Sequence, residues 1–146
     1  MKILLATDGT KHSEAAVQLI GKFNFTNDCE LKIVSIVDMA VPLAIEMYEG
    51  YMPSTIEIEN AAKENAKKII EETKVQLAQR FPQLLISTEV LLGSPESRIV
   101  ETAEEFGADL IVVGSHGYNR WERLLLGSVS DSVVHHAPCS VLVVRN

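Results

Sequence analysis

Four small residues in the last third of the sequence have the spacing of an anion-binding site. Gly114 and Gly117 are separated by two residues, and Gly127 and Ser128 follow after nine more. Glycine has no Cβ, so the backbone N–H groups at both places can approach an anion closely. Two such groups of donors around one gap predict a site for a di- or triphosphate. The alternative is structural: the first two glycines form the turn that leaves a strand, and Ser128 only caps a helix.

Short apolar runs alternate with segments of helical periodicity along the whole sequence. Continuous runs of Val, Ile and Leu are typical of strands that are covered on both faces, and their alternation with helices indicates a parallel sheet. The pattern predicts the α/β class, with an open five-stranded parallel sheet, helices on both faces and a single domain over residues 1–146. The expected strands are Ile3–Ala6, Leu31–Val37, Leu84–Leu92, Asp109–Val113 and Ser140–Val144.

Four helices are expected between these strands, and local signals mark their ends. Ser94 and Pro95 have the positions of an N-cap and a first helical residue, and Gly107 is a typical stop. The long connection from Asp38 to Pro53 is predicted to be either a cover over a ligand or partner, or a short additional helix. The expected helices run from Ser13 to Gly21, from Ser54 to Pro82, from Pro95 to Gly107, and from Ser128 to His136.

Small and polar residues close the first two expected strands. Ala6, Thr7 and Asp8 close the first strand, and Val37 closes the second. In an open parallel sheet, ligands bind outside the carboxyl ends of the strands, at the point where the strand order reverses. We therefore expect these residues to lie near the glycine turn at Gly114. The Asp8 carboxylate has two open interpretations: it helps to hold a divalent ion on the phosphates, or it caps the turn that follows it.

The glycine spacing, with serine at its last position, resembles the nucleotide-binding signature of the universal stress protein family. The segments Ile3–Gly9, Leu110–Gly117 and Leu124–Val144 also resemble the opening strand, the central motif and the closing stretch of that family. The resemblance implies a Rossmann-like fold of the adenine nucleotide alpha-hydrolase-like type. It further implies the branch of the family that binds ATP. Mg²⁺ or Mn²⁺ would accompany the nucleotide if Asp8 takes the first of its two open roles.

The resemblance also assigns a role to each residue of the site. It places Asp8 beside the ribose, the backbone of Ala6 and Thr7 along the same wall, and Val37 against the adenine. The loop after the fourth strand would wrap the phosphates, and the start of the last helix would hold them from the other side. The implied ATP-binding residues are Ala6, Thr7, Asp8, Val37, Gly114, Ser115, His116, Gly117, Gly127, Ser128, Val129 and Ser130, and Arg120 is added to them as a candidate from its charge.

The segment Tyr118–Arg123 departs from the family pattern, which often has small residues there. Its bulk would narrow the phosphate channel. Arg120 and Arg123 are candidates to neutralise a triphosphate, and the alternative is an exposed loop with solvated charges. Trp121 is equally suited to anchor a contact between subunits.

Composition and charge exclude several classes of function. Twenty Asp and Glu against thirteen Lys and Arg give a net charge of −7, so nucleic acid is not an expected partner. The apolar runs are too short for a membrane span or a signal-peptide core, and we expect a cytoplasmic protein. Cys29 and Cys139 have no second pair beside them, which argues against a zinc site and a disulfide framework. Both cysteines are expected to be buried.

Common catalytic motifs are absent from the sequence. It contains no P-loop, no G-x-G-x-x-G fingerprint and no G-x-S-x-G nucleophile elbow. Together with the resemblance, this absence predicts a nucleotide-dependent regulator in stress response with little or no turnover. One alternative is a slow metal-dependent ATPase, in which Asp8 or His116 positions metal or water. Another is a dimeric interaction protein with a vestigial pocket. The final strand, Ser140–Val144, is expected at a sheet edge, where it would join a homodimer.

Overall fold

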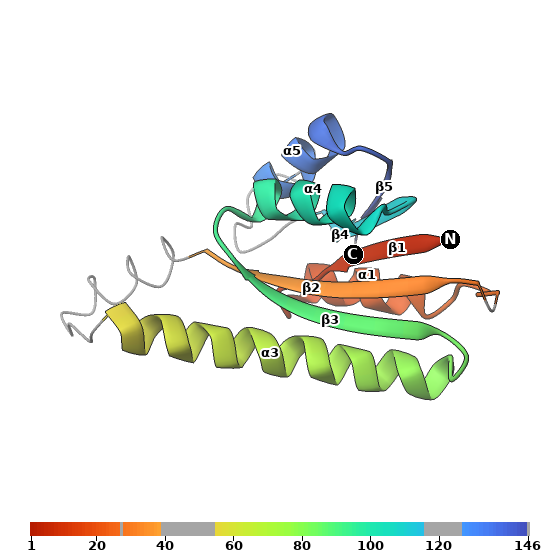
Figure 1. The fold of residues 1–146 in the computed structure, drawn as a ribbon, viewed down its shortest axis with the longest axis horizontal. Helices are drawn as coiled ribbons and strands as arrows, with labels where there is room; N and C mark the ends of the chain where they lie inside the picture. The colour runs from red at the N-terminus through yellow and green to blue at the C-terminus, as the bar shows by residue number, and fades with distance from the viewer. Residues whose placement is uncertain (27, 39–54, 116–126, 146) are drawn as a thin grey trace.

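Strands and helices alternate along the described part of the chain (Figure 1). The computed structural model describes residues 1–26, 28–38, 55–115 and 127–145. Its helices are α1 (Lys11–Ile20), α3 (Thr55–Arg80), α4 (Pro95–Phe106) and α5 (Ser128–His136). Its strands are β1 (Lys2–Ala6), β2 (Glu30–Val37), β3 (Leu85–Leu92), β4 (Leu110–Gly114) and β5 (Ser140–Val144).

The five strands form one parallel sheet in the order β3-β2-β1-β4-β5. The chain starts in the middle at β1, extends outward through β2 and β3, and then returns to β4 on the other side of β1. The strand order therefore reverses between β1 and β4, which is where an open sheet of this kind binds ligands. The predicted α/β class and five-stranded parallel sheet are confirmed. β5 lies at one edge of the sheet, as predicted, and β3 lies at the other.

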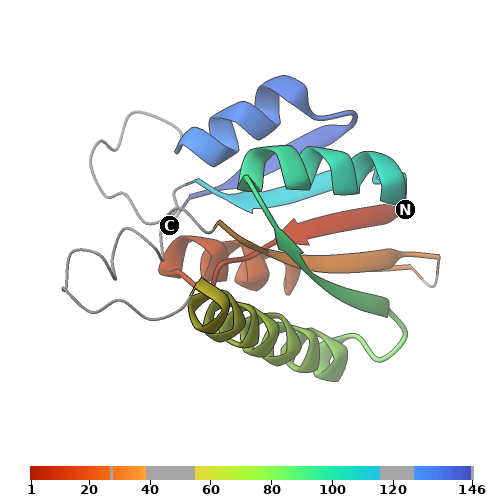
Figure 2. The same ribbon diagram turned by 60° about the vertical axis from the view of Figure 1, so that its left-hand side comes forward.

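Helices cover both faces of this sheet (Figures 1 and 2). α1 and α3 pack on one face, and α4 and α5 pack on the other. Alternate residues of β1 face the two layers: Ile3 and Leu5 lie in the core under α1 and α3, whereas Leu4 lies in the core under α4 and α5. All three side chains are fully buried, and each contributes about 1.5–3 kcal/mol of hydrophobic free energy. The residues that follow β1 are therefore held by packing on both sides.

The ends of α1 and α4 lie close to the predicted residues, but one cap differs. α1 begins at Lys11 rather than at Ser13. α4 ends as predicted at Gly107, whose φ of 66° is left-handed. Ser94 takes the predicted N-cap position of α4, yet its side chain makes no cap hydrogen bond to the backbone. It bonds the Glu96 carboxylate instead, and this contact, with the backbone N–H of Glu96, lowers the pKa of Glu96.

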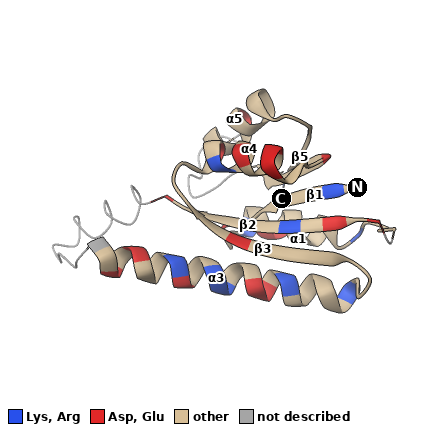
Figure 3. Ribbon diagram, in the orientation of Figure 1, with Lys and Arg blue, Asp and Glu red and all other residues tan. Residues whose placement is uncertain are grey.

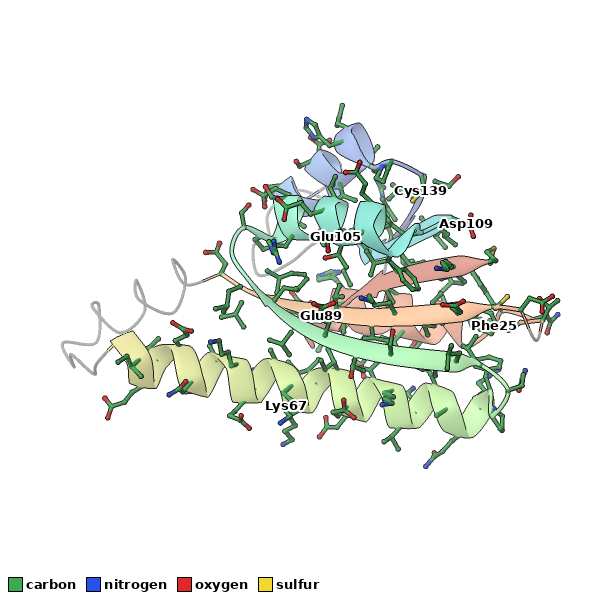
Figure 4. The ribbon with its side chains drawn as sticks, viewed as in Figure 1. Phe25, Lys67, Glu89, Glu105, Asp109 and Cys139 are labelled. Carbon is green, nitrogen blue, oxygen red and sulfur yellow. The ribbon has the colours of Figure 1, made fainter. Side chains whose placement is uncertain are left out.

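Two predictions about burial need correction. Cys29 is buried as predicted, but Cys139 is only partly buried. Its thiol and Asp109 lie near each other at the amino ends of β5 and β4 (Figure 4), and burial together with that carboxylate raises the pKa of Cys139. Strand β3 is an edge strand that is partly open to solvent, since Leu85 is 66% exposed. The predicted cover or helix between the second strand and α3 falls on residues 39–54, outside the described residues.

The long helix α3 combines a buried stripe with a charged outer surface (Figure 3). Ion pairs between neighbouring turns join Lys63 to Glu59 and Lys68 to Glu72 on that surface. Such exposed pairs contribute only about 0.2–0.5 kcal/mol each, so the apolar stripe is what holds α3 against the sheet. The buried residues of the stripe are Ile58, Ala66, Ile70, Thr73 and Leu77.

Candidate functional site

The turn between β1 and α1 fixes the orientation of Asp8. One carboxylate oxygen of Asp8, Oδ1, accepts hydrogen bonds from the backbone N–H of Thr10 (3.0 Å) and from the Thr10 hydroxyl (2.7 Å). The Asp8 side chain therefore caps the turn, which is one of the two roles predicted for it. The other oxygen, Oδ2, makes no hydrogen bond or ion pair with the described residues. Asp8 thus presents one oriented acceptor beyond the end of β1.

Gly9 allows this turn to form. Its φ of 74° is left-handed, a conformation that residues with a Cβ rarely adopt. A Cβ at this position would also lie only 2.9 Å from Cδ1 of Ile69 in α3. The turn that carries Asp8 is therefore both left-handed and covered by α3.

Two buried hydroxyl groups, those of Thr7 and Ser13, form hydrogen bonds that stabilise the same turn. The Thr7 hydroxyl donates to the Ser13 hydroxyl over 3.1 Å, and the Ser13 hydroxyl donates to the carbonyl of Thr10 over 3.0 Å. The backbone N–H of Asp8 lies 3.3 Å from the Ser13 oxygen. Thr7 and Ser13 are each 5% exposed, and buried hydroxyls of this kind must be bonded to avoid a desolvation cost.

Ser13 was not predicted as a site residue, although the sequence carries a signal for it. Ser13 precedes Ala16, Val17 and Ile20 at the spacing of one helix face, and all four residues are buried. A serine at a position of the apolar stripe must find a polar partner inside the protein. That partner is the turn that holds Asp8.

Gly114 brings the end of β4 into backbone contact with the first turn of α1. A Cβ on Gly114 would lie 2.7 Å from both the carbonyl carbon and the carbonyl oxygen of His12, and 2.9 Å from the backbone nitrogen of Ser13. The glycine is therefore required by helix packing, whatever it contributes to a ligand. This contact packs the start of α1 against the end of β4, at the point where the strand order of the sheet reverses.

Ser115 and Gly127 are joined to each other, and this pair is called the clasp below. The backbone N–H of Gly127 donates to the carbonyl of Ser115 over 2.8 Å, and the N–H of Ser115 donates to the carbonyl of Val144 over 2.8 Å. The Ser130 hydroxyl lies 3.1 Å from the Ser115 carbonyl and 3.0 Å from the Gly127 carbonyl. The clasp therefore places the start of α5 directly beside the carboxyl end of β4.

The first turn of α5 has no side-chain cap. Gly127 is the N-cap and supplies no side-chain cap, and Ser128 is the first helical residue. The alternative that Ser128 only caps the helix is therefore wrong. The first N–H groups of a helix have no partner within it and favour a negative charge. Val129 is half-buried against the core, and the Ser130 hydroxyl is directed inward to the clasp.

The remaining predicted residues are placed as follows. Ala6 and Val37 are buried at the ends of β1 and β2, and the Val37 carbonyl accepts the N–H of Gly93 over 3.1 Å. Predicted positions His116, Gly117 and Arg120 lie outside the described residues. The described part thus brings together the carboxyl ends of three strands, one oriented carboxylate and one helix start without a side-chain cap.

This chemistry suits recognition of a ligand with hydroxyl groups and negative charge. The Asp8 carboxylate can accept from hydroxyls, and the N–H groups of α5 can donate to an anion. No group of three or more His, Cys, Asp or Glu side chains gathers to hold a metal among the residues that the structure describes. Nor is any helix within those ranges long and apolar enough to cross a membrane.

The model of the Universal stress protein family matches residues 1–145 of this chain. The chain belongs to this family. The family predicted from the glycine spacing is thereby confirmed. The chain is 35% identical over 144 residues to a putative universal stress protein of Staphylococcus aureus (strain USA300), and the alignment covers 98% of this chain and 82% of that protein.

Solved structures show the same universal stress protein fold. One is a hypothetical protein determined as a test case of structural genomics, with a TM-score of 0.84, 29% identity, and coverage of 99% of this chain and 95% of that one. Another is a universal stress protein in complex with cAMP, with a TM-score of 0.65, 25% identity, and coverage of 99% and 95%. At least one structural relative in the family therefore binds an adenine nucleotide.

Proposed function

We propose that this universal stress protein binds ATP at the carboxyl edge of the sheet between β1 and β4, and that it acts as a nucleotide-dependent regulator with little or no turnover. The observation that carries the proposal is the convergence of Asp8 and the start of α5, which has no side-chain cap, on the end of β4, at the reversal of strand order. The cAMP complex of a relative supports the ligand class. A cytoplasmic location and a single domain over residues 1–146 belong to the same proposal.

The adenosine half of ATP would lie on the β1 and β2 side. Val37 would contact the adenine, and the backbone of Ala6 and Thr7 would form the wall beside it. Asp8 would accept hydrogen bonds from the ribose hydroxyls. Its fixed Oδ1 and its second oxygen support this role, because an acceptor that is already oriented loses little entropy on binding.

The phosphates would lie between the ends of β4 and α5. Their ligands would be Gly114, Ser115, His116, Gly117, Arg120, Gly127, Ser128, Val129 and Ser130. For Ser128 and Val129 the donors are backbone N–H groups of the first turn of α5. Ser130 would act through the clasp, since its hydroxyl already bonds Ser115 and Gly127.

Mg²⁺ or Mn²⁺ would be held mainly by the phosphates. Asp8 is a single carboxylate and one of its oxygens is engaged by Thr10, and no group of three or more metal-ligating side chains gathers among the described residues. Such ions commonly combine one or two carboxylates with substrate phosphates. The slow-ATPase alternative needs this ion together with His116 or Asp8 as a water-positioning group.

A homodimer through β5 is part of the same proposal. β5 is an edge strand, and its residues Val141, Leu142 and Val143 are only partly buried. Edge strands with apolar side chains readily pair with another strand. Pairing of β5 with the β5 strand of a second subunit would cover this edge in both subunits.

Two measurements on the purified protein test the nucleotide proposal. Mass spectrometry of ligand released by denaturation should detect an adenine nucleotide, and calorimetric titration of ligand-free protein should show binding of ATP. Asp8→Ala should weaken ATP and adenosine alike, because the ribose is common to both. Phosphate release with Mg²⁺ should stay at the background rate. Absence of ATP binding would refute the proposal, and Mg²⁺-dependent turnover that Asp8→Ala abolishes would favour the ATPase instead.

A further inference from the structure

Two cations from opposite ends of the sequence lie beside the end of β4. Lys11 directly precedes His12, whose backbone contacts Gly114. Arg145 directly follows Val144, whose carbonyl accepts the N–H of Ser115. Each cation is thus one residue away from a backbone segment that contacts the dipeptide Gly114–Ser115.

Neither cation is neutralised within the described part of the chain. Lys11 and Arg145 are exposed, and neither forms an ion pair with a described carboxylate. Elsewhere in this acidic chain several cations do have partners, as in the ion pairs Lys32–Glu89 and Arg98–Glu101.

Lys11 also occupies the unfavourable end of its helix. It is the first residue of α1, where the positive end of the helix dipole repels a cation. The N-cap Thr10 does not offset this, because its hydroxyl is bonded to Asp8 and makes no cap bond. An anion bound near Lys11 would convert this repulsion into attraction with both the lysine and the dipole.

We propose that Lys11 and Arg145 form a cationic pair that neutralises the phosphates of the bound nucleotide and makes the site prefer nucleoside triphosphates over nucleosides and monophosphates. This inference rests on the proposed function and adds two residues to its site. Arg145 has the planar, two-donor geometry that binds phosphate oxygens, whereas Lys11 acts as a mobile point charge. Because both side chains are exposed, salt should screen their contribution.

The test compares three ligands in one double variant. Lys11→Gln with Arg145→Gln removes both charges and keeps polar side chains of similar length. Calorimetric titration should show an affinity for ATP that is at least about tenfold lower than in the wild-type protein. The affinity for AMP should fall by less, and the affinity for adenosine should not change. The salt dependence of ATP binding should also become shallower than in the wild-type protein.

Lys67→Gln is the matched control. Lys67 is exposed on the outer surface of α3, points away from the sheet, and also has no ion pair among the described residues (Figure 4). Lys67→Gln removes one positive charge, as each of the two substitutions in the double variant does. ATP binding and its salt dependence should be unchanged in Lys67→Gln.

The outcomes separate this inference from the proposed function. If the wild-type protein binds neither adenosine nor ATP, the proposed function fails and the cationic pair fails with it. If the wild-type protein binds ATP and the double variant binds it equally well, only the cationic pair is refuted. An equal loss for ATP and adenosine, or a loss of ATP affinity in Lys67→Gln as large as half of that in the double variant on the free-energy scale, also overturns the inference. A thermal melt of each variant confirms that the folded protein was titrated.

Discussion

The contact between Gly114 and the first turn of α1 leads to a quantitative prediction for Gly114→Ala. The added Cβ would lie 2.7 Å from two backbone atoms of His12 and 2.9 Å from the backbone nitrogen of Ser13. These atoms belong to a helix backbone and cannot move aside as a flexible side chain would. The start of α1 must therefore move away from β4 as a unit.

The size of this shift sets the expected cost. Ordinary van der Waals contact begins near 3.4 Å, so the backbone of His12 must move by about 0.7 Å. Overpacking of this kind typically costs about 1–3 kcal/mol. For a domain near 150 residues each kcal/mol lowers the Tm by about 2–4 °C. We therefore expect Gly114→Ala to melt about 2–12 °C below the wild-type protein.

The assay is a thermal melt followed by calorimetric titration with ATP. Because the same shift displaces the turn that holds Asp8, ATP affinity should fall by at least about threefold, or roughly 0.7 kcal/mol. Gly107→Ala is the comparison variant. Gly107 ends α4 near the amino end of β4, away from the carboxyl ends of the strands where the site lies, and a Cβ there meets nothing within 4 Å. Its left-handed φ should cost about 1 kcal/mol of stability, without any change in ATP affinity.

A Tm for Gly114→Ala within about 1 °C of the wild-type value would refute the packing argument. The glycine would then be needed only for the ligand. A lower Tm with unchanged ATP affinity would keep the packing argument and remove the link between α1 and the nucleotide.

Three further predictions concern other parts of the molecule. Gly117→Ala combined with Gly127→Ala should lower ATP affinity by at least about tenfold, roughly 1.4 kcal/mol. The protein should stay folded, because Gly127 has a φ of −62°, which residues with a side chain also adopt. Unchanged affinity in calorimetry would remove the phosphate assignment. Val143→Lys should weaken a homodimer that pairs through β5, and a variant that still sediments as a dimer would count against that interface. Burial and the Asp109 carboxylate raise the pKa of Cys139, so Asp109→Asn should lower that pKa and speed thiol alkylation at a given pH; a pH profile that does not move would contradict this.

The fold could be predicted because its signals are local. Buried strands are continuous apolar runs, and Gly107 and Pro95 mark the two ends of α4 as their backbone chemistry requires. The caps were less predictable, since a side chain chooses among several partners. Ser94 bonds Glu96 rather than the helix backbone, and Gly21 ends α1 with right-handed angles.

The sequence predicted where the candidate site residues would gather, but not which contacts require each of them. The glycine spacing and the carboxyl-end rule both indicated the carboxyl ends of the strands, where the structure places Asp8, Gly114 and the start of α5. Gly114, however, is required by the approach of α1, a contact between residues about a hundred positions apart. The inward hydroxyl of Ser130 likewise depends on where β4 ends. Such long-range contacts leave no pattern in a single sequence.

The clasp between Ser115 and Gly127 has a consequence for how the family can diversify. Ser115 directly follows β4 and Gly127 is the N-cap of α5, and the hydrogen bond between these two residues joins the end of the strand to the start of the helix. The clasp therefore holds the two residues that flank positions 116–126 next to each other, so we expect a change in the number of residues between them to leave both in place. Doubling the length of a flexible connection costs only about 0.6 kcal/mol. A graft of this segment between relatives should therefore leave the stability of the scaffold nearly unchanged, which makes the clasp a suitable boundary for such an exchange.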